Sequence, residues 1–594
     1  MAQVRIQHSL SDGEKNYLSG RKLCVQKCLV KNNIPCTLSK VPNIAILGSG
    51  GGERAMVGLL GSLSQMGEAG LLDAALYMSG VSGSTWCMAS LYEKPNWSSD
   101  MEQIKVVAER LGHGSVSRKE RVWHLIGYYR ANFFNFSLTD VWSALVVPEI
   151  VKKIDKSTLS NYQKCHDKDP YPIYTVINQD CKYEHLQRET FFELTPHEAG
   201  YTLAGAFVET SDFGSIFNKG VLTRRKPEMD MTYLQGLCGS ALADKEVILK
   251  ILKEWLEGGE NMKALKDHKG VQLLSTVVDL QLCQYTVCDP APLLKTANEL
   301  LLGKMGLDGC MLQLNFDGKN SADQNEQIQT VTSAASKFFF EWNKDLVNLE
   351  VREELDVFVK TLDKVTEKSP DKLVGGGSKV DELLKKFIDR VKQEAVALQS
   401  HAGPRLMLQV LELYYGIHRE EDWTHLVVEL NTLLKAPHID KRLLQSETTH
   451  FEDAGLLVNS PYMSALRHER EIDLIISFDF SAGNPMETLT ETAEECKDLG
   501  ISFPKIQYTK SDVSSPKGFY VFKGLKKAPT VIHIPLFNVD NCGSKLEDYR
   551  KKYGTFQGAY SPEMIEDLIK KAGENVLNNK ETLLRVIKDI IEQK

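Results

Sequence analysis

The chain has 594 residues, of which 42% are hydrophobic and 25% are charged, a composition typical of a soluble globular protein with a large core. The formal net charge of -8 argues against a general nucleic-acid-binding protein and against broad attraction to anionic membranes. No apolar run approaches the length of a membrane span, and residues 1–8 contain no signal-peptide core, so we expect neither a transmembrane segment nor secretion.

The 12 cysteines include no C-x-x-C pair. Cys24 with Cys28, or Cys283 with Cys288, would need further cysteine or histidine ligands to bind a metal, and the sequence offers no evident set of them. We therefore interpret the cysteines as the reduced thiols of a cytosolic protein. We expect neither a metal site nor a bound cofactor.

Residues 10–33 are predicted to form one helix, because Ser11 followed by Glu14 is typical of a capped helix start and an apolar stripe follows. The helix is rich in lysine and arginine. Such a helix can lie on a membrane surface, or it can pack on the domain and expose its basic face, and we favour packing. Residues 1–41 are thus interpreted as an N-terminal helix and linker, and residues 42–594 as the main domain.

The first strand of the main domain is predicted at 44–47, an apolar run followed by the glycine-rich loop 48–52 and a helix over 53–66. Such a loop exposes backbone N–H groups at a helix N-terminus. Two chemistries fit. The loop can cradle a phosphate, since Gly50 to Ala55 satisfies the dinucleotide pattern G-x-G-x-x-A, or it can form an oxyanion hole for acyl transfer.

A second strand, a tight turn and a helix start are predicted over 76–86, with Ser82 in the turn between Gly80 and Gly83. Small neighbours permit the strained turn of a nucleophile elbow, although the match to G-x-S-x-G is partial because Ser84 stands at the fifth position. Alone, Ser82 could equally be an ordinary loop serine. A glycine loop and a serine elbow on successive strands favour an oxyanion hole beside a nucleophile over a dinucleotide site, which would need an acidic residue there.

The remaining chain has strands alternating with helices at both ends, which predicts an α/β fold. Helices are expected over much of 101–163 and a strand at 173–177, and further strands are expected at 473–478 and 530–534. Charged helical segments between these parts predict a helical insertion at about 245–440. The insertion could be a lid over the site or a passive helical layer, and the sequence does not separate the two.

A serine hydroxyl needs a base before it can attack an ester at neutral pH. His450 and His533 lie in the C-terminal α/β part and are candidates. Asp453 is another, because the turn Asp453-Ala454-Gly455 at the end of an extended segment would direct its carboxylate out of the sheet. A serine–aspartate dyad needs no histidine if burial increases the basicity of the aspartate, but Asp453 could also be an ordinary turn residue.

Three motifs, far apart in the chain, resemble the catalytic set of cytosolic (group IV) phospholipases A2, which are patatin-related Ser/Asp acyl hydrolases. They are Gly48-Ser49-Gly50-Gly51-Gly52-Glu53-Arg54-Ala55, Ser79-Gly80-Val81-Ser82-Gly83-Ser84-Thr85-Trp86 and Asp453-Ala454-Gly455. The resemblance covers about 40–245 and 448–560, and it is strongest to the gamma member. It implies a patatin-like, three-layer α/β phospholipase catalytic domain at 42–594, with a mixed central sheet and a helical insertion.

The resemblance also implies a role for each residue of the motifs. Ser82 would attack the ester carbonyl and become acylated, and Asp453 would accept the serine proton and later activate water. The N–H groups of Gly51, Gly52 and Gly83 would hold the oxyanion.

Two arginines would bind the substrate phosphate according to the same resemblance. Arg54 follows the glycine loop and carries the planar, permanently charged group that suits this task, although it could instead form a structural ion pair. Arg470, three residues before Asp473, matches a second arginine of the family. Only about 40 residues precede the first strand, which leaves no room for the calcium-dependent β-sandwich of several relatives, so we expect calcium independence.

Together with these residues, the resemblance implies a cytosolic phospholipase A2-like esterase that hydrolyses fatty-acyl esters of glycerophospholipids at a membrane or micelle surface. Lysophospholipase or transacylase activity would follow from the same acyl-enzyme. The chain ends Ile591-Glu592-Gln593-Lys594, without the terminal cysteine box of the gamma member, so we expect peripheral and reversible membrane contact. The alternatives are a patatin-like lipase acting on neutral lipids and a catalytically silent lipid-binding scaffold with the same fold.

Overall fold

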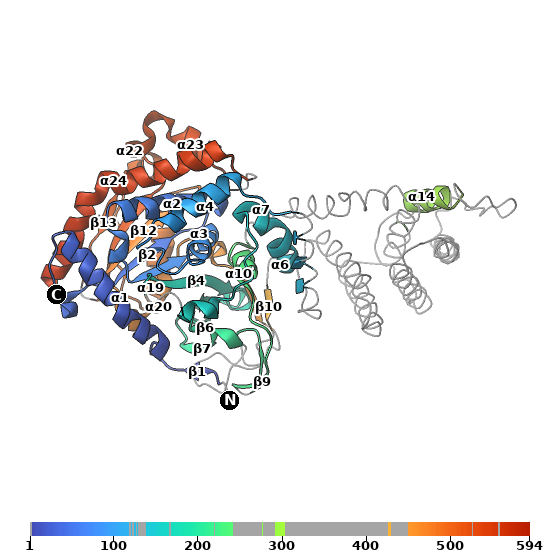
Figure 1. Cartoon of the computed structure of the whole chain (residues 1–594), viewed down its shortest axis with the longest axis horizontal. Helices are drawn as coiled ribbons and strands as arrows, with labels where there is room; N and C mark the ends of the chain where they lie inside the picture. Colours follow the sequence, from blue (N-terminus) through green and yellow to red (C-terminus); the bar gives the residue numbers. More distant parts are fainter. Residues whose placement is uncertain are drawn as a thin grey trace. The chain divides into compact units, whose positions relative to one another are not determined.

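The structure is a computed structural model of the chain (Figure 1). It describes residues 3–240 except 118–119, 122–123, 126, 129–137, 165–167 and 219, then Thr276, 291–302, 426–428, and 449–594 except 526 and 556–558. The chain divides into two compact units, residues 1–248 with 422–594 and residues 249–421. In the second unit the description comprises Thr276 and helix α14 (Ala291–Leu302). The predicted insertion and its role as a lid lie largely outside the described residues and stay predictions.

The middle of the sheet in the first unit is parallel. In spatial order its strands are β4 (Tyr171–Asn178), β3 (Tyr77–Gly80), β2 (Ile44–Gly48), β12 (Leu474–Asp479) and β14 (Thr530–Pro535). The first four are buried along their whole length, because helices cover both faces, and their sequences show no alternation of polar and apolar residues. Strands from both ends of the chain meet here, since β12 pairs with β2 on one side and with β14 on the other.

Antiparallel strands extend this parallel part on both sides, so the sheet is mixed. β13 (Tyr520–Phe522) pairs with β14, and β5 (Phe191–Leu194), β6 (Glu198–Tyr201), β7 (Ala206–Glu209) and β1 (Arg5–Ile6) follow β4 in this order. β11 (Thr449–Asp453) also pairs with β4, and β10 (Leu426–Val428) pairs with β11. Within the described residues the sheet has 12 strands, and β8 (Ile216–Asn218) with β9 (Val221–Arg224) forms a separate hairpin.

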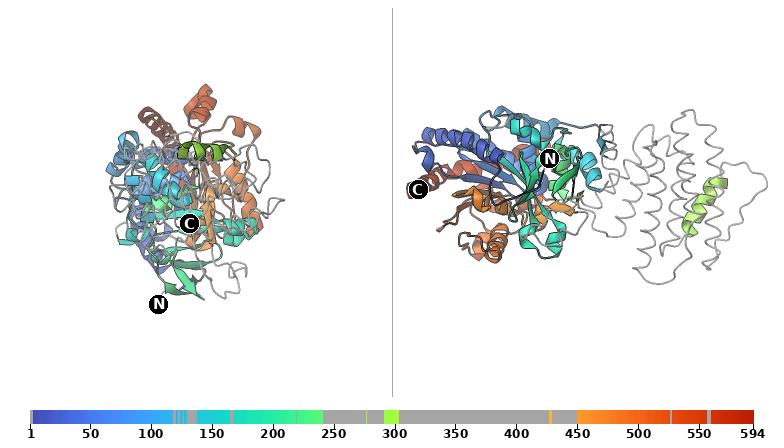
Figure 2. Two further views of the ribbon diagram at one scale, coloured as in Figure 1. Left: turned by 90° about the vertical axis from the view of Figure 1, so that its right-hand side faces the viewer. Right: turned by 90° about the horizontal axis from the view of Figure 1, so that it is seen from below.

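Helices lie on both faces of the sheet (Figures 1 and 2). On one face, α2 (Gly52–Glu68) packs against α3 (Gly83–Leu91), α4 (Glu102–His113) and the long α24 (Pro562–Gln593). A methyl group on Gly61 would lie 2.5 Å from the carbonyl oxygen of Ile569, so α2 and α24 approach each other through a glycine. On the other face, α19 (Tyr462–Ala465) and α20 (Glu487–Leu499) bury Met463 and Cys496 against Phe191. The predicted three-layer α/β fold is confirmed.

The N-terminal helix α1 (Asp12–Lys31) packs on the domain, as the favoured interpretation of its sequence had it. The predicted cap is present, because the Ser11 hydroxyl accepts the N–H of Glu14 at 3.0 Å. Tyr17, Val25 and Leu29 are buried. The exposed face carries lysines, namely Lys15, Lys27 and Lys31.

The remaining helices are short and connect the elements of the first unit. They are α6 (Leu138–Val141), α7 (Val147–Val151), α8 (Gln179–Tyr183), α9 (Gln187–Thr190), α10 (Met231–Cys238), α21 (Lys510–Ser514), α22 (Val539–Cys542) and α23 (Leu546–Lys552). None of the helices in the described ranges combines the length and the apolar character needed to cross a bilayer.

Candidate active site

Two glycine turns meet where β2 and β3 end. Gly51 and Gly52 follow β2 with φ angles of 147° and 61°, which glycine adopts far more readily than other residues. A methyl group on Gly83 would lie 1.8 Å from the carbonyl oxygen of Gly52, so the turn after β3 touches the turn after β2 through backbone. Gly52 and Gly83 begin α2 and α3, and their N–H groups therefore have no acceptor within their own helices. The two helix N-termini also add positive potential at this point.

Ser82 stands at the top of β3 in a strained elbow. Its φ and ψ angles are 51° and -126°, a conformation that costs a residue with a side chain about 1–3 kcal/mol. Hydrogen bonds on both sides hold the turn: the N–H of Val81 donates to the Gly48 carbonyl at 3.1 Å, and the Ser84 hydroxyl donates to the Ser49 carbonyl at 2.6 Å. Ser84, the residue that breaks the G-x-S-x-G pattern, thus ties the elbow to the glycine loop.

One edge of β4 brings the elbow and Asp453 together. β3 pairs with the first half of this edge, with Gly80 opposite Tyr174, and β11 pairs antiparallel with the second half, with Asp453 opposite Val176. Both strands lie on the same edge, since β5 occupies the other. Val176 is two residues beyond Tyr174, about 7 Å along a strand, so β3 and β11 run towards each other and end close together.

The Asp453 carboxylate is fully buried at this meeting point. Its Oδ1 accepts the N–H of Gly455 at 2.8 Å, and its own N–H donates to the Ser240 hydroxyl at 3.1 Å. A methyl group on Gly455 would lie 3.1 Å from Asp453 Oδ1 and 3.5 Å from Cγ1 of Val81, so these two atoms are within about 7 Å of each other. Since Val81 precedes Ser82, the carboxylate lies beside the elbow.

A buried cysteine of α10 is also close to Asp453. Burial raises the pKa of the Cys238 thiol, the negative charge of Asp453 raises it further, and a hydrogen bond with Thr85 opposes the two effects. The thiol therefore stays protonated near neutral pH and is a poor nucleophile. Ser82 remains the better candidate for the attacking group.

The two histidines considered as alternative bases make other contacts. His450 Nδ1 is 2.9 Å from Asp180 Oδ1, and His533 Nε2 is 2.6 Å from the Pro485 carbonyl oxygen. Burial lowers the pKa of His533, so this ring is neutral near pH 7. β14, which carries His533, is separated from β3 by β12 and β2. These contacts favour Asp453 as the candidate base.

The guanidinium group of Arg54 is buried beside the glycine loop. It donates to the carbonyl oxygens of Phe480 and Tyr553 at 2.7 and 2.6 Å, and to the Thr555 hydroxyl at 3.0 Å. A methyl group on Gly51 would lie 2.9 Å from Arg54 Nη2. Arg54 thus joins two distant loops to the glycine loop, and its contact with a substrate phosphate stays a prediction.

Arg470 lies at the opposite ends of the parallel strands from Ser82. Asn43, which directly precedes β2, donates to the Arg470 carbonyl at 3.1 Å, whereas the glycine loop follows β2. The guanidinium group binds Glu193 of β5 at 2.8 Å and Glu14 of α1 at 3.0 Å. These buried ion pairs indicate a structural role for Arg470 in place of the predicted contact with a substrate phosphate.

Glu53 is a buried carboxyl group in the first turn of α2. Its Oε2 accepts the N–H of Tyr560 at 2.9 Å, and its Oε1 has no hydrogen-bond partner among the described residues. Burial raises the pKa of Glu53 to about 7, and the N–H of Tyr560 and the charge of Lys152 oppose this shift. A titratable group thus lies next to the glycine loop, which the sequence did not predict.

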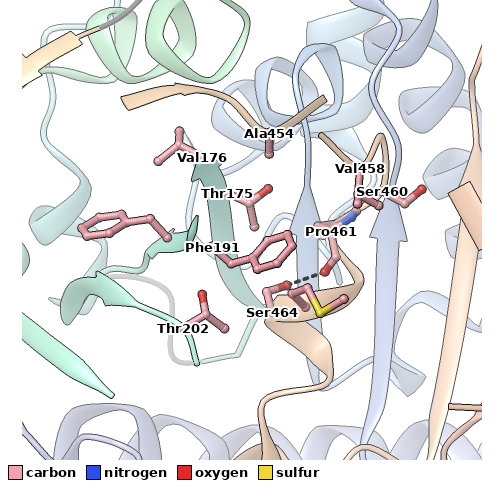
Figure 3. A pocket seen from close by; sticks show the side chains of 11 residues that line it. Thr175, Val176, Phe191, Thr202, Ala454, Val458, Ser460, Pro461 and Ser464 are labelled. Carbon is pink, nitrogen blue, oxygen red and sulfur yellow. Dashed lines mark hydrogen bonds between the residues drawn. The ribbon is translucent and has the colours of Figure 1, made fainter. Parts of the chain in front are cut away.

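A small pocket lies beside the turn Ala454-Gly455, which follows Asp453 (Figure 3). Phe191 stands at its centre, between Thr175 of β4 and Ser464 of α19, and Ala454 forms part of its wall. Its volume is about 20 Å³, room for about one water molecule. In the described part of the chain, no cluster of three or more histidine, cysteine, aspartate or glutamate side chains could hold a metal ion.

Comparison with known proteins agrees with the fold. The family model described as "Lysophospholipase catalytic domain" matches residues 44–258. The solved structure "Human GIVD cytosolic phospholipase A2" superposes with a TM-score of 0.63 at 19% identity, over 100% of this chain and 69% of that chain, and it supports the fold.

The sequence relatives are more specific. "Cytosolic phospholipase A2 gamma" of Mus musculus is 32% identical over 98% of this chain and 91% of its own length. The protein of the same name from Homo sapiens is 32% identical over 99% of this chain and 96% of its own length. The chain belongs to the cytosolic phospholipase A2 family and is an enzyme of that class, and the resemblance to the gamma member is confirmed.

Proposed function

We propose that this chain hydrolyses fatty-acyl esters of glycerophospholipids through a dyad of Ser82 and Asp453. The observation that carries the proposal is the meeting of the strained Ser82 elbow and the buried Asp453 carboxylate on one edge of β4, beside the glycine loop. A nucleophile, a base and a set of N–H donors are the three groups that acyl transfer requires.

In the proposed reaction, Asp453 accepts the proton of the Ser82 hydroxyl while the serine oxygen attacks the ester carbonyl. The N–H groups of Gly51, Gly52 and Gly83 hold the negatively charged oxygen. When the intermediate collapses, the lysophospholipid leaves as an alcohol and takes the proton from Asp453. Asp453 then takes a proton from water as the water oxygen attacks the acyl-serine, and the fatty acid leaves as Ser82 regains its proton.

The same acyl-enzyme supports two related activities. A lysophospholipid can replace the phospholipid as acyl donor, and an alcohol can replace water as acceptor, which gives lysophospholipase and transacylase activity. Negative charge in this scheme is stabilised by backbone N–H groups and two helix N-termini, so the reaction does not depend on calcium. We assign the enzyme to the cytosol, where it acts peripherally at a phospholipid membrane or micelle surface.

Labelling with a fluorophosphonate is the first test. The probe phosphonylates an activated serine, and we expect one label, at Ser82, that is lost in Ser82→Ala. Turnover of phosphatidylcholine in mixed micelles should fall by about 10³-fold or more in Ser82→Ala while micelle binding survives. A wild-type protein that binds micelles but is neither labelled nor active would support the silent scaffold.

Arg54→Lys tests the proposed contact with the substrate phosphate. Lysine keeps the charge but loses the planar fork that suits a phosphate group. We expect the variant to lose much more turnover on phosphatidylcholine than on a neutral fatty-acyl ester. Equal losses on both substrates would contradict the phosphate role and would favour a neutral lipase in which Arg54 only holds its loops.

A further inference from the structure

Asn459 joins three loops at the edge of the sheet where Ser82 lies. Its Nδ2 donates to the Gly50 carbonyl at 3.2 Å and to the Ser481 hydroxyl at 2.8 Å. Its backbone carbonyl accepts the N–H of Gly50 at 3.0 Å. Asn459 follows the Asp453 turn, Gly50 belongs to the glycine loop and Ser481 follows β12, so one side chain connects the segments that end there.

The orientation of the Asn459 amide follows from its partners. The carbonyl of Gly50 can only accept a hydrogen bond, so the amide nitrogen must face it. The Ser481 hydroxyl donates its proton to Asp479 Oδ1 at 2.6 Å, and it therefore accepts from Asn459. A chain of hydrogen bonds thus runs from the buried Asp479 through Ser481 and Asn459 to the glycine loop, which leaves the amide oxygen on the opposite side.

The amide oxygen of Asn459 lies between the two groups of the proposed dyad. A methyl group on Gly50 would be 2.3 Å from Asn459 Oδ1 and 3.0 Å from Ser82 Cβ, so these two atoms are at most about 5 Å apart. A methyl group on Gly455 would be 3.0 Å from Asn459 Oδ1 and 3.1 Å from Asp453 Oδ1, which are thus at most about 6 Å apart. Asn459 therefore borders Ser82, Asp453 and the glycine loop at once.

We propose that Asn459 is a positioning residue that fixes the glycine loop relative to Ser82 and Asp453. The inference rests on the proposed function, since it concerns the geometry of that reaction. The two hydrogen bonds of Nδ2 hold the loop whose N–H groups would receive the oxyanion, and small displacements of such donors cost large factors in rate. Asn459 acts through the backbone of Gly50, and it keeps a neutral oxygen beside the carboxylate of Asp453.

The charged and titratable groups around Asn459 make aspartate an informative replacement. Asp453 faces its amide oxygen, Asp479 lies beyond Ser481, and the thiol of Cys238 is close to Asp453 on the α10 side. Asn459→Asp has almost the same shape but places a second carboxylate next to Asp453. Like charges disfavour ionisation, so the pH at which the proposed base becomes active should rise.

The experiment compares Asn459→Asp, Asn459→Ala and Asn484→Asp with the wild type. Asn484 follows β12, and its replacement adds the same charge in the loop that leads into α20. The rate of fluorophosphonate labelling at Ser82 and kcat and KM on phosphatidylcholine micelles are measured from pH 5 to 9, with thermal unfolding of each variant. We expect Asn459→Ala to lower kcat by about tenfold or more with little change in KM.

For Asn459→Asp we expect the acidic limb of both pH profiles to move to higher pH by at least half a unit, while the profile of Asn484→Asp stays with the wild type. Unchanged kcat in Asn459→Ala and unchanged limbs in Asn459→Asp would overturn the role of Asn459. The role of Asn459 would also be overturned if kcat falls only in proportion to the fraction of folded protein. If the wild type itself is not labelled, the proposed function fails first, and the two failures are thus distinguishable.

Discussion

Replacement of Glu53 by glutamine should make the protein more stable at neutral and alkaline pH. Glutamine has nearly the same shape, and its amide oxygen can accept the N–H of Tyr560 that Glu53 Oε2 accepts at 2.9 Å. It cannot ionise. The effect of Glu53→Gln should therefore depend on pH in the way that the titration of Glu53 dictates.

The sign follows from the two pKa values. Burial raises the pKa of Glu53 from 4.5 to about 7 in the folded protein. Below about pH 4.5 the carboxyl is protonated in both the folded and the unfolded state and costs nothing. Between about pH 4.5 and pH 7 only the unfolded chain loses the proton, so the stability of the folded state falls as the pH rises. This loss of stability is complete above about pH 7. The shift predicts that the folded state loses about 2–3 kcal/mol between pH 5 and pH 8, at 1.36 kcal/mol per pKa unit.

Thermal unfolding of the wild type and of Glu53→Gln at pH 5, 6, 7 and 8 measures this difference. We expect the melting temperature of the variant to rise relative to the wild type with increasing pH and to level off above pH 7. Glu68→Gln removes the same charge from the exposed end of α2 and should show no such trend. A difference that is equal at pH 5 and pH 8 would refute the reasoning.

Three further substitutions test the site and the fold. Asp453→Asn keeps a hydrogen-bond acceptor for the N–H of Gly455 but removes the group that would accept the serine proton. Turnover should therefore fall by about 10³-fold or more without a large change in melting temperature. Normal turnover would exclude Asp453 as the base. Gly83→Ala places a methyl group 1.8 Å from a backbone carbonyl and should abolish fluorophosphonate labelling, whereas Gly112→Ala, where the nearest atom is 3.7 Å away, should be tolerated. Burial alone would raise the pKa of Glu193, but Arg470 holds this pKa below its usual value. Glu193→Gln should therefore destabilise the protein by about 3–5 kcal/mol near pH 7 and by less at acidic pH. A loss of stability that does not change with pH would contradict this.

The sequence predicted the local elements of the fold well. The apolar runs expected at 44–47 and 530–534 are β2 (Ile44–Gly48) and β14 (Thr530–Pro535). The helix expected over 10–33 is α1 (Asp12–Lys31), with its predicted cap. These features depend on neighbouring residues only, and residue spacing therefore reports them.

The relation between distant segments could not be read from spacing. No local pattern shows that β11 pairs with β4 on the same edge as β3, beyond the end of β3. This pairing of β11 with β4 brings Asp453 close to Ser82. The acidic partners of Arg470 are 456 and 277 residues away in the chain, so its structural role was invisible. Asn459 stands in an irregular segment without a motif, and its contacts appear only when the loops are assembled.

The pairing of β2 with β12, a strand from the far end of the chain, has a practical consequence. The segment matched by the family model, 44–258, contains Ser82 but neither Asp453 nor β12, the strand that covers the open edge of β2. Expressed by itself, such a piece would expose an apolar sheet edge and would aggregate. Co-expression of residues 1–248 with residues 422–594 should instead allow fragment complementation, and soluble recovery of the first piece would then report on assembly with the second.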